Sequence, residues 1–403
     1  MAEEDKIQPA TAQERNVFAL WKKNKNDTGI NLAFGFKTQN LNVDKLEYAL
    51  NQIIVRHDRL RSSFCEENEC VIRKISENCR LFIEHFASKN LSDFIRPFNL
   101  EKAPLLRVAV QGETVLIDIC HIVTDGFSMA VFFSELNMFY SGQPVRYNPT
   151  PIPPDNESEL SSNTEFWASQ FKNPFLPLRL PADKKGNAGL YGGDGSSLVH
   201  CIESSLTRRV QKVCRELSVT PFVFYFSAFM LFLAKESALD DVVTATNLSC
   251  RSPRTMRSIG LLARVAPVRF KLPESGTVKD FLLSVSLSVK SALLHQQFDT
   301  DELLARMGFS DLRDFSRTIF TFEHERIADI RLDGKKCEFV PIPSRHSASD
   351  LTLCFFPFKN QGLILSIFRT DLFSHQQIRK FLRHYEKIIE SFLHIDESIK
   401  SIL

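Results

Sequence analysis

The chain has 403 residues, of which 43% are hydrophobic and 24% are charged. This length suggests two domains of about 200 residues each, and the composition is that of a soluble globular protein. The formal net charge of +2 and the scattered Lys and Arg residues argue against nucleic acid as a partner.

The N-terminal residues, MAEEDKIQPA, are acidic and polar, the reverse of the basic and then apolar order of a signal peptide. We expect no membrane span, because no run of about 18 apolar residues is present. The nine cysteines stand singly, without a C-x-x-C pair and without histidines at zinc spacing. Cys65 and Cys70 are close together, which is more often incidental than a metal site or a disulfide. These features predict a cytoplasmic, metal-free protein, and we expect a monomer.

The first half of the chain alternates helix and strand patterns. Residues 42–56 carry apolar residues at helical spacing after a possible N-cap, Asn42. Residues 104–120 favour two strands joined by a tight turn at Gln111-Gly112. Gly126 leads into a segment, 127–140, that is apolar almost all round and therefore predicts a buried helix. Five prolines within 142–156 predict an irregular connection, and a short helix is expected near 161–171.

The second half repeats this alternation. Pro and Gly clusters make 172–195 the expected domain boundary. Helices are expected over 206–217, 220–236 and 277–294, and strands over 240–250 and 263–270. Residues 350–369 predict a hairpin that turns at Lys359–Gly362, and the last helix is expected to begin with a capping box at Ser374–Gln377. The fold class is therefore α/β with mixed sheets, in two similar lobes.

The stretch Ile117–Met129, IDICHIVTDGFSM, places His121 where a strand ends, and Asp125 and Gly126 follow just before a helix. A histidine can act as a general base near neutral pH, and a strand end holds it firmly. Asp125 could orient the ring, or it could pair with an arginine and hold the loop. A histidine with an aspartate at this short spacing is more often structural than functional. The chain has no G-x-S-x-G elbow and no evident cysteine nucleophile, so a functional base would favour direct attack of a bound acceptor on an activated acyl group.

Eight segments in order extend this motif over almost the whole chain: TAQERNVFALW (11–21), RHDRLRSSF (56–64), FIRPFNLEKAPLLRVAV (94–110), ICHIVTDGFSM (119–129), LRLPADKKG (178–186), NLSCRSP (247–253), IGLLARVAPVRF (259–270) and SASDLTLCFF (347–356). Together they resemble the condensation domains of nonribosomal peptide synthetases, in the chloramphenicol-acetyltransferase-like superfamily. The resemblance implies two acetyltransferase-like lobes, roughly 1–176 and 177–403, in a V shape with a tunnel between them. Donor and acceptor, tethered to the phosphopantetheine arms of carrier proteins, would enter from opposite faces.

The resemblance assigns roles residue by residue. His121 matches the catalytic histidine, and Gly126 matches a glycine whose backbone N–H lies near the reacting centre. Asp125 matches a structural aspartate, and Arg61 and Arg251 match arginines associated with it. We therefore predict an ion pair between Asp125 and one of these arginines, and a His121 that works without a charge relay.

The chain departs from the family pattern at several positions. Cys120 replaces the first histidine of the motif, and Cys250 replaces the usual glycine before Arg251. Phe127 stands where tryptophan is expected, and IGLLARVAPVRF lacks the usual asparagine, which puts its channel contacts in doubt. The residues assigned to the substrate channel are Thr124, Phe127, Ser128 and Ser349. Motifs of cyclisation and epimerisation variants are not found.

The leading hypothesis is an amide-forming acyltransferase, in which an amine attacks an acyl or aminoacyl thioester on a carrier protein. It would bind no cofactor directly, whether it is free-standing or one domain of a longer synthetase. One alternative keeps His121 as the base and transfers an acyl group from coenzyme A or a carrier to a soluble alcohol or amine. The other is a non-catalytic scaffold that docks carrier proteins.

Overall fold

The computed structural model describes residues 6–186, 192–309, 313–323, 327, 330–343, 345–358 and 361–402. The chain divides into two units, each of which is discontinuous in sequence. Unit 1 consists of Met1–Asp155, Arg251–Ala263 and His324–Arg345. Unit 2 consists of Asn156–Cys250, Arg264–Glu323 and His346–Leu403.

These units differ from the expected lobes 1–176 and 177–403 at two points. Residues 156–176 belong to unit 2, where helix α4 (Glu157–Ser169) is fastened by Trp167 Nε1, which donates to the carbonyl of His295 at 2.8 Å. Segments 251–263 and 324–345 return from the second half of the sequence to unit 1. Proline and glycine clusters mark breaks in regular structure, but they do not show which hydrogen bonds a segment makes afterwards.

Unit 1 contains a five-stranded sheet and smaller sheets. The strand order of the large sheet is β14-β2-β7-β6-β5, with β5 and β6 parallel and the other pairs antiparallel. Its strands are β14 (Glu338–Val340), β2 (Asn31–Lys37), β7 (Thr114–Cys120), β6 (Leu106–Gln111) and β5 (Glu84–His85). The smaller sheets are formed by β1 (Lys6–Pro9), β4 (Cys70–Ile75) and β3 (Ser62–Glu67), and by β12 (Arg331–Leu332) and β13 (Lys335–Lys336).

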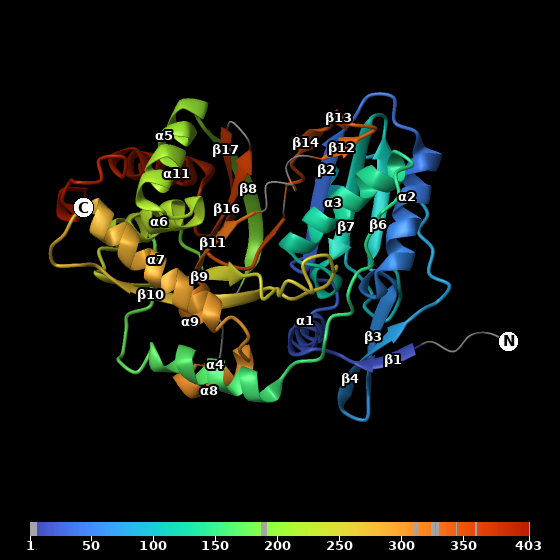
Figure 1. The fold of residues 1–403 in the computed structure, drawn as a ribbon, viewed down its shortest axis with the longest axis horizontal. Helices are drawn as coiled ribbons and strands as arrows, with labels where there is room; N and C mark the ends of the chain where they lie inside the picture. Colours follow the sequence, from blue (N-terminus) through green and yellow to red (C-terminus); the bar gives the residue numbers. More distant parts are fainter. Residues whose placement is uncertain are drawn as a thin grey trace. The chain divides into compact units, whose positions relative to one another are not determined.

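The helices of unit 1 follow the expected patterns. The N-cap side chain of Asn42 starts α2 (Val43–Arg56), which lies beside α3 (Gly126–Tyr140) against the large sheet (Figure 1). The expected hairpin at Gln111-Gly112 is present, and Gly112 adopts φ +58°, which glycine permits without strain. The other helices are α1 (Ala12–Lys23) and the short η1 (Asp58–Arg61), η2 (Leu91–Phe94) and η3 (His121–Val123).

Unit 2 is built on a seven-stranded sheet of order β10-β9-β11-β16-β17-β8-β15. β11 is parallel to both of its neighbours, so the sheet is mixed. The expected hairpin is formed by β16 and β17, and its turn at 359–360 lies outside the described residues. The strands are β10 (Arg264–Lys271), β9 (Asp241–Leu248), β11 (Thr318–Phe322), β16 (Leu351–Phe358), β17 (Gln361–Arg369), β8 (Gly193–Ile202) and β15 (His346–Ser347).

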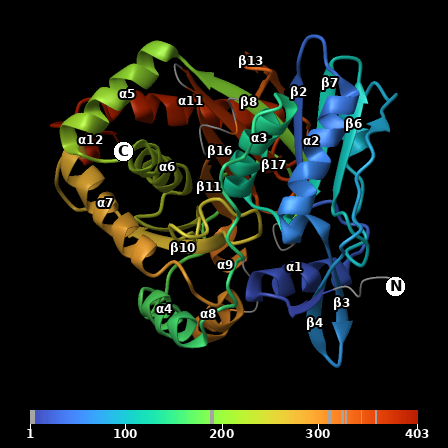
Figure 2. The ribbon, with the colours of Figure 1, turned by 45° about the vertical axis from the view of Figure 1, so that its right-hand side comes forward.

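One face of this sheet carries four helices that surround the core of unit 2 (Figures 1 and 2). They are α5 (Ser204–Leu217), α6 (Pro221–Ser237), α7 (Val278–Leu294) and α11 (His375–Ser391), and the shorter helices are α8 (Thr300–Met307), α9 (Arg313–Ser316) and α12 (Ile399–Ile402). Most side chains of α6 are buried, as its continuous apolar sequence predicts. Ser374 caps α11 as expected, but the side chain of Gln377 donates to the carbonyl of Pro181 instead of completing a capping box.

Over the part of the chain that the structure describes, no single helix has the length and hydropathy needed to cross a membrane. By these two measures only, the pair α5 and α6 passes together, with a bend of 107° between the helices. Among the same residues, His, Cys, Asp and Glu side chains form no group of three or more that could hold a metal ion.

Candidate active site

The motif around His121 connects the buried strand β7 to the helix α3 through the single turn η3. The backbone N–H of His121 donates to the carbonyl of Ile30 at 2.7 Å, which extends the pairing of β2 with β7 by one residue. Thr124 N–H then donates to the carbonyl of His121 at 3.3 Å and closes the turn. The imidazole is therefore attached to a residue whose backbone N–H and carbonyl groups are both hydrogen-bonded.

A hydrogen bond of the side chain sets the tautomer of His121. Nδ1 of the ring lies 2.8 Å from the backbone carbonyl oxygen of Thr124. Since a carbonyl oxygen can only accept, Nδ1 must carry the proton and donate it. In the neutral ring, Nε2 is then left with its lone pair, and this is the arrangement that a general base requires.

The carboxylate of Asp125 is fully occupied by donors other than His121. Oδ1 accepts from Ser128 N at 2.7 Å, from Ser128 Oγ at 2.8 Å and from Arg251 Nη2 at 2.9 Å. Oδ2 accepts from the backbone N–H groups of Leu262 at 3.0 Å and Ala263 at 3.1 Å. Asp125 is thus the N-cap of α3, and it connects segment 251–263 to the start of that helix. None of these hydrogen bonds orients the imidazole.

Of the two arginines expected near Asp125, only Arg251 pairs with it. The Arg251 side chain is buried, and its Nη1 also donates to the carbonyls of Thr255 at 2.8 Å and Ser258 at 2.7 Å. Its guanidinium carbon lies 4.7 Å from the ring centre of Phe127, within cation–π range. The buried charge is retained because Asp125 neutralises it and because both terminal nitrogens of the guanidinium donate hydrogen bonds.

Arg61 lies in a different cluster. Its Nη2 is 2.5 Å from Asp58 Oδ1, and its Nη1 is 3.2 Å from Glu77 Oε1. Nη1 also donates to the carbonyl of Ser76 at 3.0 Å. Arg61 therefore fastens η1 to the end of β4 and does not contact Asp125.

Cys120, at the position of the family's first histidine, is completely buried at the end of β7. Burial raises the pKa of its thiol to about 12, so the thiol stays protonated near neutral pH. A protonated, buried thiol is a poor nucleophile. The local chemistry therefore gives no support to an acyl-cysteine intermediate at this residue.

Asp118 shares a face of β7 with Cys120 and forms a buried polar cluster. Its carboxylate accepts from Asn31 Nδ2 at 2.9 Å and lies 3.3 Å from Arg107 Nη1. Burial is the largest influence and raises the pKa of Asp118 to about 7, although Arg107 and Asn31 oppose it. Asp118 lies three residues before His121, so its ionisation bears on the strand that positions the imidazole.

This cluster predicts a pH dependence of stability. An unfolded Asp loses its proton near pH 3.9, whereas folded Asp118 keeps it up to about pH 7. Because the folded state holds the extra proton between these values, the free energy of unfolding should fall by up to about 1.4 kcal/mol for each pH unit. Asp118→Asn should lack this contribution. Urea unfolding of the wild type and of Asp118→Asn from pH 4 to pH 8 checks this prediction. If the free energies of unfolding of the two proteins change in parallel with pH, the prediction is wrong.

The residues assigned to the channel lie in different surroundings. Thr124 is completely buried, and its hydroxyl lies 3.6 Å from Met129 Sδ. Ser128 is also buried; its hydroxyl accepts from Gly260 N at 3.1 Å and lies 2.9 Å from the carbonyl of that residue. Ser349 belongs to unit 2, where its hydroxyl is 2.7 Å from that of Thr352. Thr124 and Ser128 are thus engaged by hydrogen bonds within unit 1.

The sequence reasoning missed the contribution of the backbone in segment 258–263. The N–H groups of Gly260, Leu262 and Ala263 bind Ser128 or Asp125. The motif IGLLARVAPVRF identifies this segment by its side chains, but side-chain patterns do not report where main-chain donors point. A Cβ at Gly260 would lie 2.3 Å from Ile152 Cδ1, so a larger residue there would require the Ile152 side chain to shift.

Cys250 shows why glycine is usual at this position in the family. Its φ of +51° is in the left-handed region, which glycine adopts without the steric cost of a Cβ. Here the cysteine is accommodated by neighbouring groups, since its N–H donates to Gln296 Oε1 at 3.0 Å and its carbonyl accepts from Gln297 Nε2 at 3.0 Å. Cys250 thus adopts, just before Arg251, a backbone conformation that glycine would adopt without steric cost.

Comparisons with known proteins show which proteins this chain is similar to. The family described as Condensation domain matches residues 3–401. Gramicidin S synthase 2 of Brevibacillus brevis is 26% identical over 417 residues, which cover 97% of this chain and 9% of that protein. Surfactin synthase subunit 2 of Bacillus subtilis (strain 168) is 24% identical over 407 residues, which cover 95% of this chain and 11% of that protein. The chain thus spans about a tenth of the length of these curated relatives.

A solved structure gives the same result for the fold. The condensation domain from Monacolin K polyketide synthase superposes with a TM-score of 0.83 at 16% identity, over 98% of this chain and 100% of that domain. At this identity the likeness establishes the fold. The expected α/β class with mixed sheets of the acetyltransferase-like kind is confirmed.

Proposed function

The chain belongs to the condensation-domain family, whose members are amide-forming acyltransferases of nonribosomal peptide synthesis, and we propose how its own residues carry out that reaction. The donor would be an acyl or aminoacyl thioester on the phosphopantetheine arm of a carrier protein, and the acceptor an amine. The arm is part of the substrate, so the chain itself needs no bound cofactor. Action as a cytoplasmic monomer stays a prediction from the sequence.

The observation that carries this proposal is the tautomer of His121. With its proton on Nδ1 and donated to Thr124, the ring offers Nε2 to the acceptor amine. The amine nitrogen forms a C–N bond with the thioester carbon, and the proton that the nitrogen must lose passes to Nε2. Collapse of the tetrahedral intermediate breaks the C–S bond, and the same proton leaves with the sulfur as a thiol.

Gly126 would supply the second element of the reaction. It is the first residue of α3, and N–H groups in the first turn of a helix have no acceptor within the helix. One of these groups, that of Ser128, is already bonded to the side chain of Asp125. We assign the Gly126 N–H to the oxygen of the tetrahedral intermediate, where a backbone donor at the positive end of a helix stabilises negative charge.

Direct transfer is also favoured by what surrounds the histidine. The adjacent thiol of Cys120 is buried and protonated, and Asp125 is bound by five donors. Neither can take the acyl group or relay charge to the ring. The proposal therefore needs a single base and one oxyanion donor, with both reactants supplied from outside the chain.

A single-turnover donor and acceptor screen tests the proposal. We expect an amide product, detected by mass spectrometry, when an acyl or aminoacyl carrier protein is mixed with the chain and an amine. Coenzyme A thioesters should react more slowly, and alcohols should give little ester. Product from coenzyme A donors and soluble alcohols only would favour the alternative acyltransferase. Tight carrier binding with no product from any pair would favour the scaffold.

A further inference from the structure

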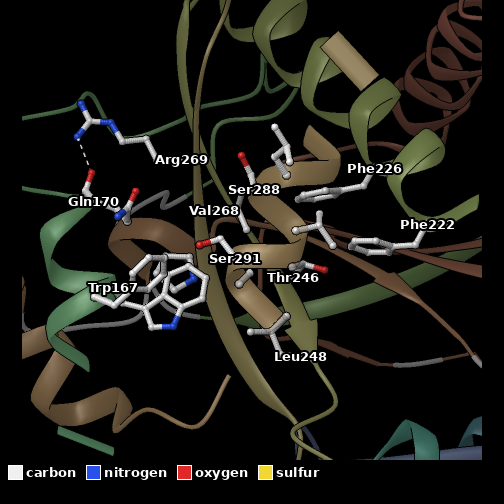
Figure 3. A pocket seen from close by; sticks show the side chains of 15 residues that line it. Trp167, Gln170, Phe222, Phe226, Thr246, Leu248, Val268, Arg269, Ser288 and Ser291 are labelled. Carbon is white, nitrogen blue, oxygen red and sulfur yellow. Dashed lines mark hydrogen bonds between the residues drawn. The ribbon is translucent and has the colours of Figure 1, made fainter. Parts of the chain in front are cut away.

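Unit 2 contains a pocket of about 350 Å³ that is separate from the residues assigned to the reaction. Its walls come from α4, α6, α7 and the strands β9 and β10. Figure 3 shows Trp167 on one side of the pocket and Phe222 and Phe226 on the other. Small-molecule sites typically have volumes of about 300–1,000 Å³, so the pocket is large enough for a compact ligand.

The sequence of α7 explains why this space is not filled. The N-terminal half of the helix carries large core residues, such as Phe281 and Leu282, which are buried. The C-terminal half presents Ser288, Ser291 and Ala292 to the pocket. Because these side chains are small, α7 leaves a gap against the aromatic residues of α4 and α6.

The aromatic side chains around the pocket are held in place. Phe222 and Phe226 stack with centroids 5.2 Å apart, and Phe166 stacks on His295 at 3.7 Å. Trp167 is fixed by its Nε1–H, which donates to the carbonyl of His295. Ordered rings at both ends favour an aromatic ligand, since aromatic pairs gain stability beyond their buried area.

The charge of the pocket selects against ions. Arg269 is the cation among the lining residues, and Asp241 neutralises it with a bidentate contact at 2.6–3.2 Å. Its remaining N–H groups donate to the carbonyls of Asn173 at 2.7 Å and Pro174 at 3.1 Å. With the guanidinium engaged in this way, a ligand anion would be desolvated without gaining a new partner.

Two further features of the pocket bear on the kind of ligand that it can bind. Figure 3 shows the Ser291 hydroxyl pointing toward Trp167, where it can bond to one polar group. Leu287 lines the pocket and is 67% exposed, so part of the solvent-facing lining is apolar. We infer that this pocket binds an uncharged aromatic molecule that carries a single hydroxyl or a similar hydrogen-bonding group.

Calorimetric titration with three naphthalene probes tests the inference. At pH 7 we expect saturable, one-to-one binding of 2-naphthol. The anion 2-naphthoate and the cation 2-naphthylmethylammonium should bind at least about tenfold more weakly, because charged groups are costly to desolvate. Equal or tighter binding of either ion, or no saturable binding of 2-naphthol, would overturn the inference.

Variants on α7 locate the site. Ser288 lines the pocket at an exposed position, so Ser288→Phe should fold normally and weaken 2-naphthol binding by about tenfold through loss of space. Ser284→Phe, one turn earlier and also exposed, should bind 2-naphthol as the wild type does. Ser291→Val should weaken 2-naphthol by about fivefold and leave naphthalene unchanged, as expected for one lost hydrogen bond. Equal weakening by Ser284→Phe and Ser288→Phe, at unchanged thermal unfolding, would refute the location.

Discussion

Replacing His121 with alanine should lower the single-turnover rate of amide formation by about 10²–10⁴-fold, the usual contribution of a positioned general base. The amine nitrogen becomes positive as it attacks, and without Nε2 its proton must go to water. The effect should be this large because the ring is held by the Nδ1–H bond to Thr124 and by backbone on both sides. Quenched-flow measurement with a verified carrier donor and amine acceptor gives the rate directly.

Cys120→Ala is the matched control for His121→Ala. Cys120 is the adjacent residue, but its thiol is buried and protonated, so most activity should remain. Both variants should bind acyl-carrier protein and retain the wild-type circular dichroism spectrum. If the two substitutions have equal and small effects on rate, His121 is not the base and the scaffold alternative gains support.

Local patterns predicted most of the elements, because they report on short-range forces. Asn42 caps α2, Gly112 allows the turn between β6 and β7, and the apolar sequence of α6 forms a buried helix. Each of these depends on residues within a few positions of one another. The resemblance to a family added the pairing of Asp125 with an arginine distant in sequence, which no local pattern can supply.

The remaining features depend on contacts between distant segments. Arg61 and Arg251 were equivalent as partners of Asp125 in the sequence, and only the return of segment 251–263 to unit 1 separates them. The Thr124 carbonyl that orients His121 is a main-chain group, so residue identity does not reveal it. The sequence also does not reveal that α4 belongs to unit 2. Side chains of α4 donate to the main-chain carbonyls of Gln297 and His295, and residue identity does not report such acceptors.

Replacing Asp125 with alanine should destabilise unit 1 by about 3–5 kcal/mol, the usual cost of removing one partner from a buried ion pair. The variant leaves the Arg251 guanidinium without its counter-charge. It also leaves the N–H groups of Ser128, Leu262 and Ala263 without the acceptor that they share. Urea unfolding followed by circular dichroism measures the loss, and activity should fall with it because the N-terminus of α3 is no longer fixed.

Arg61→Ala and Arg251→Ala separate the two arginines in the same experiment. The partners of Arg61, Asp58 and Glu77, are 39% and 44% exposed, so its loss should cost below about 1 kcal/mol. Arg251→Ala should cost as much as Asp125→Ala. The double variant of Asp125 and Arg251 should be destabilised by less than the sum of the single variants, because it leaves no unpaired buried charge. An Asp125→Ala protein that is as stable as Arg61→Ala but inactive would instead show that Asp125 acts in the reaction itself.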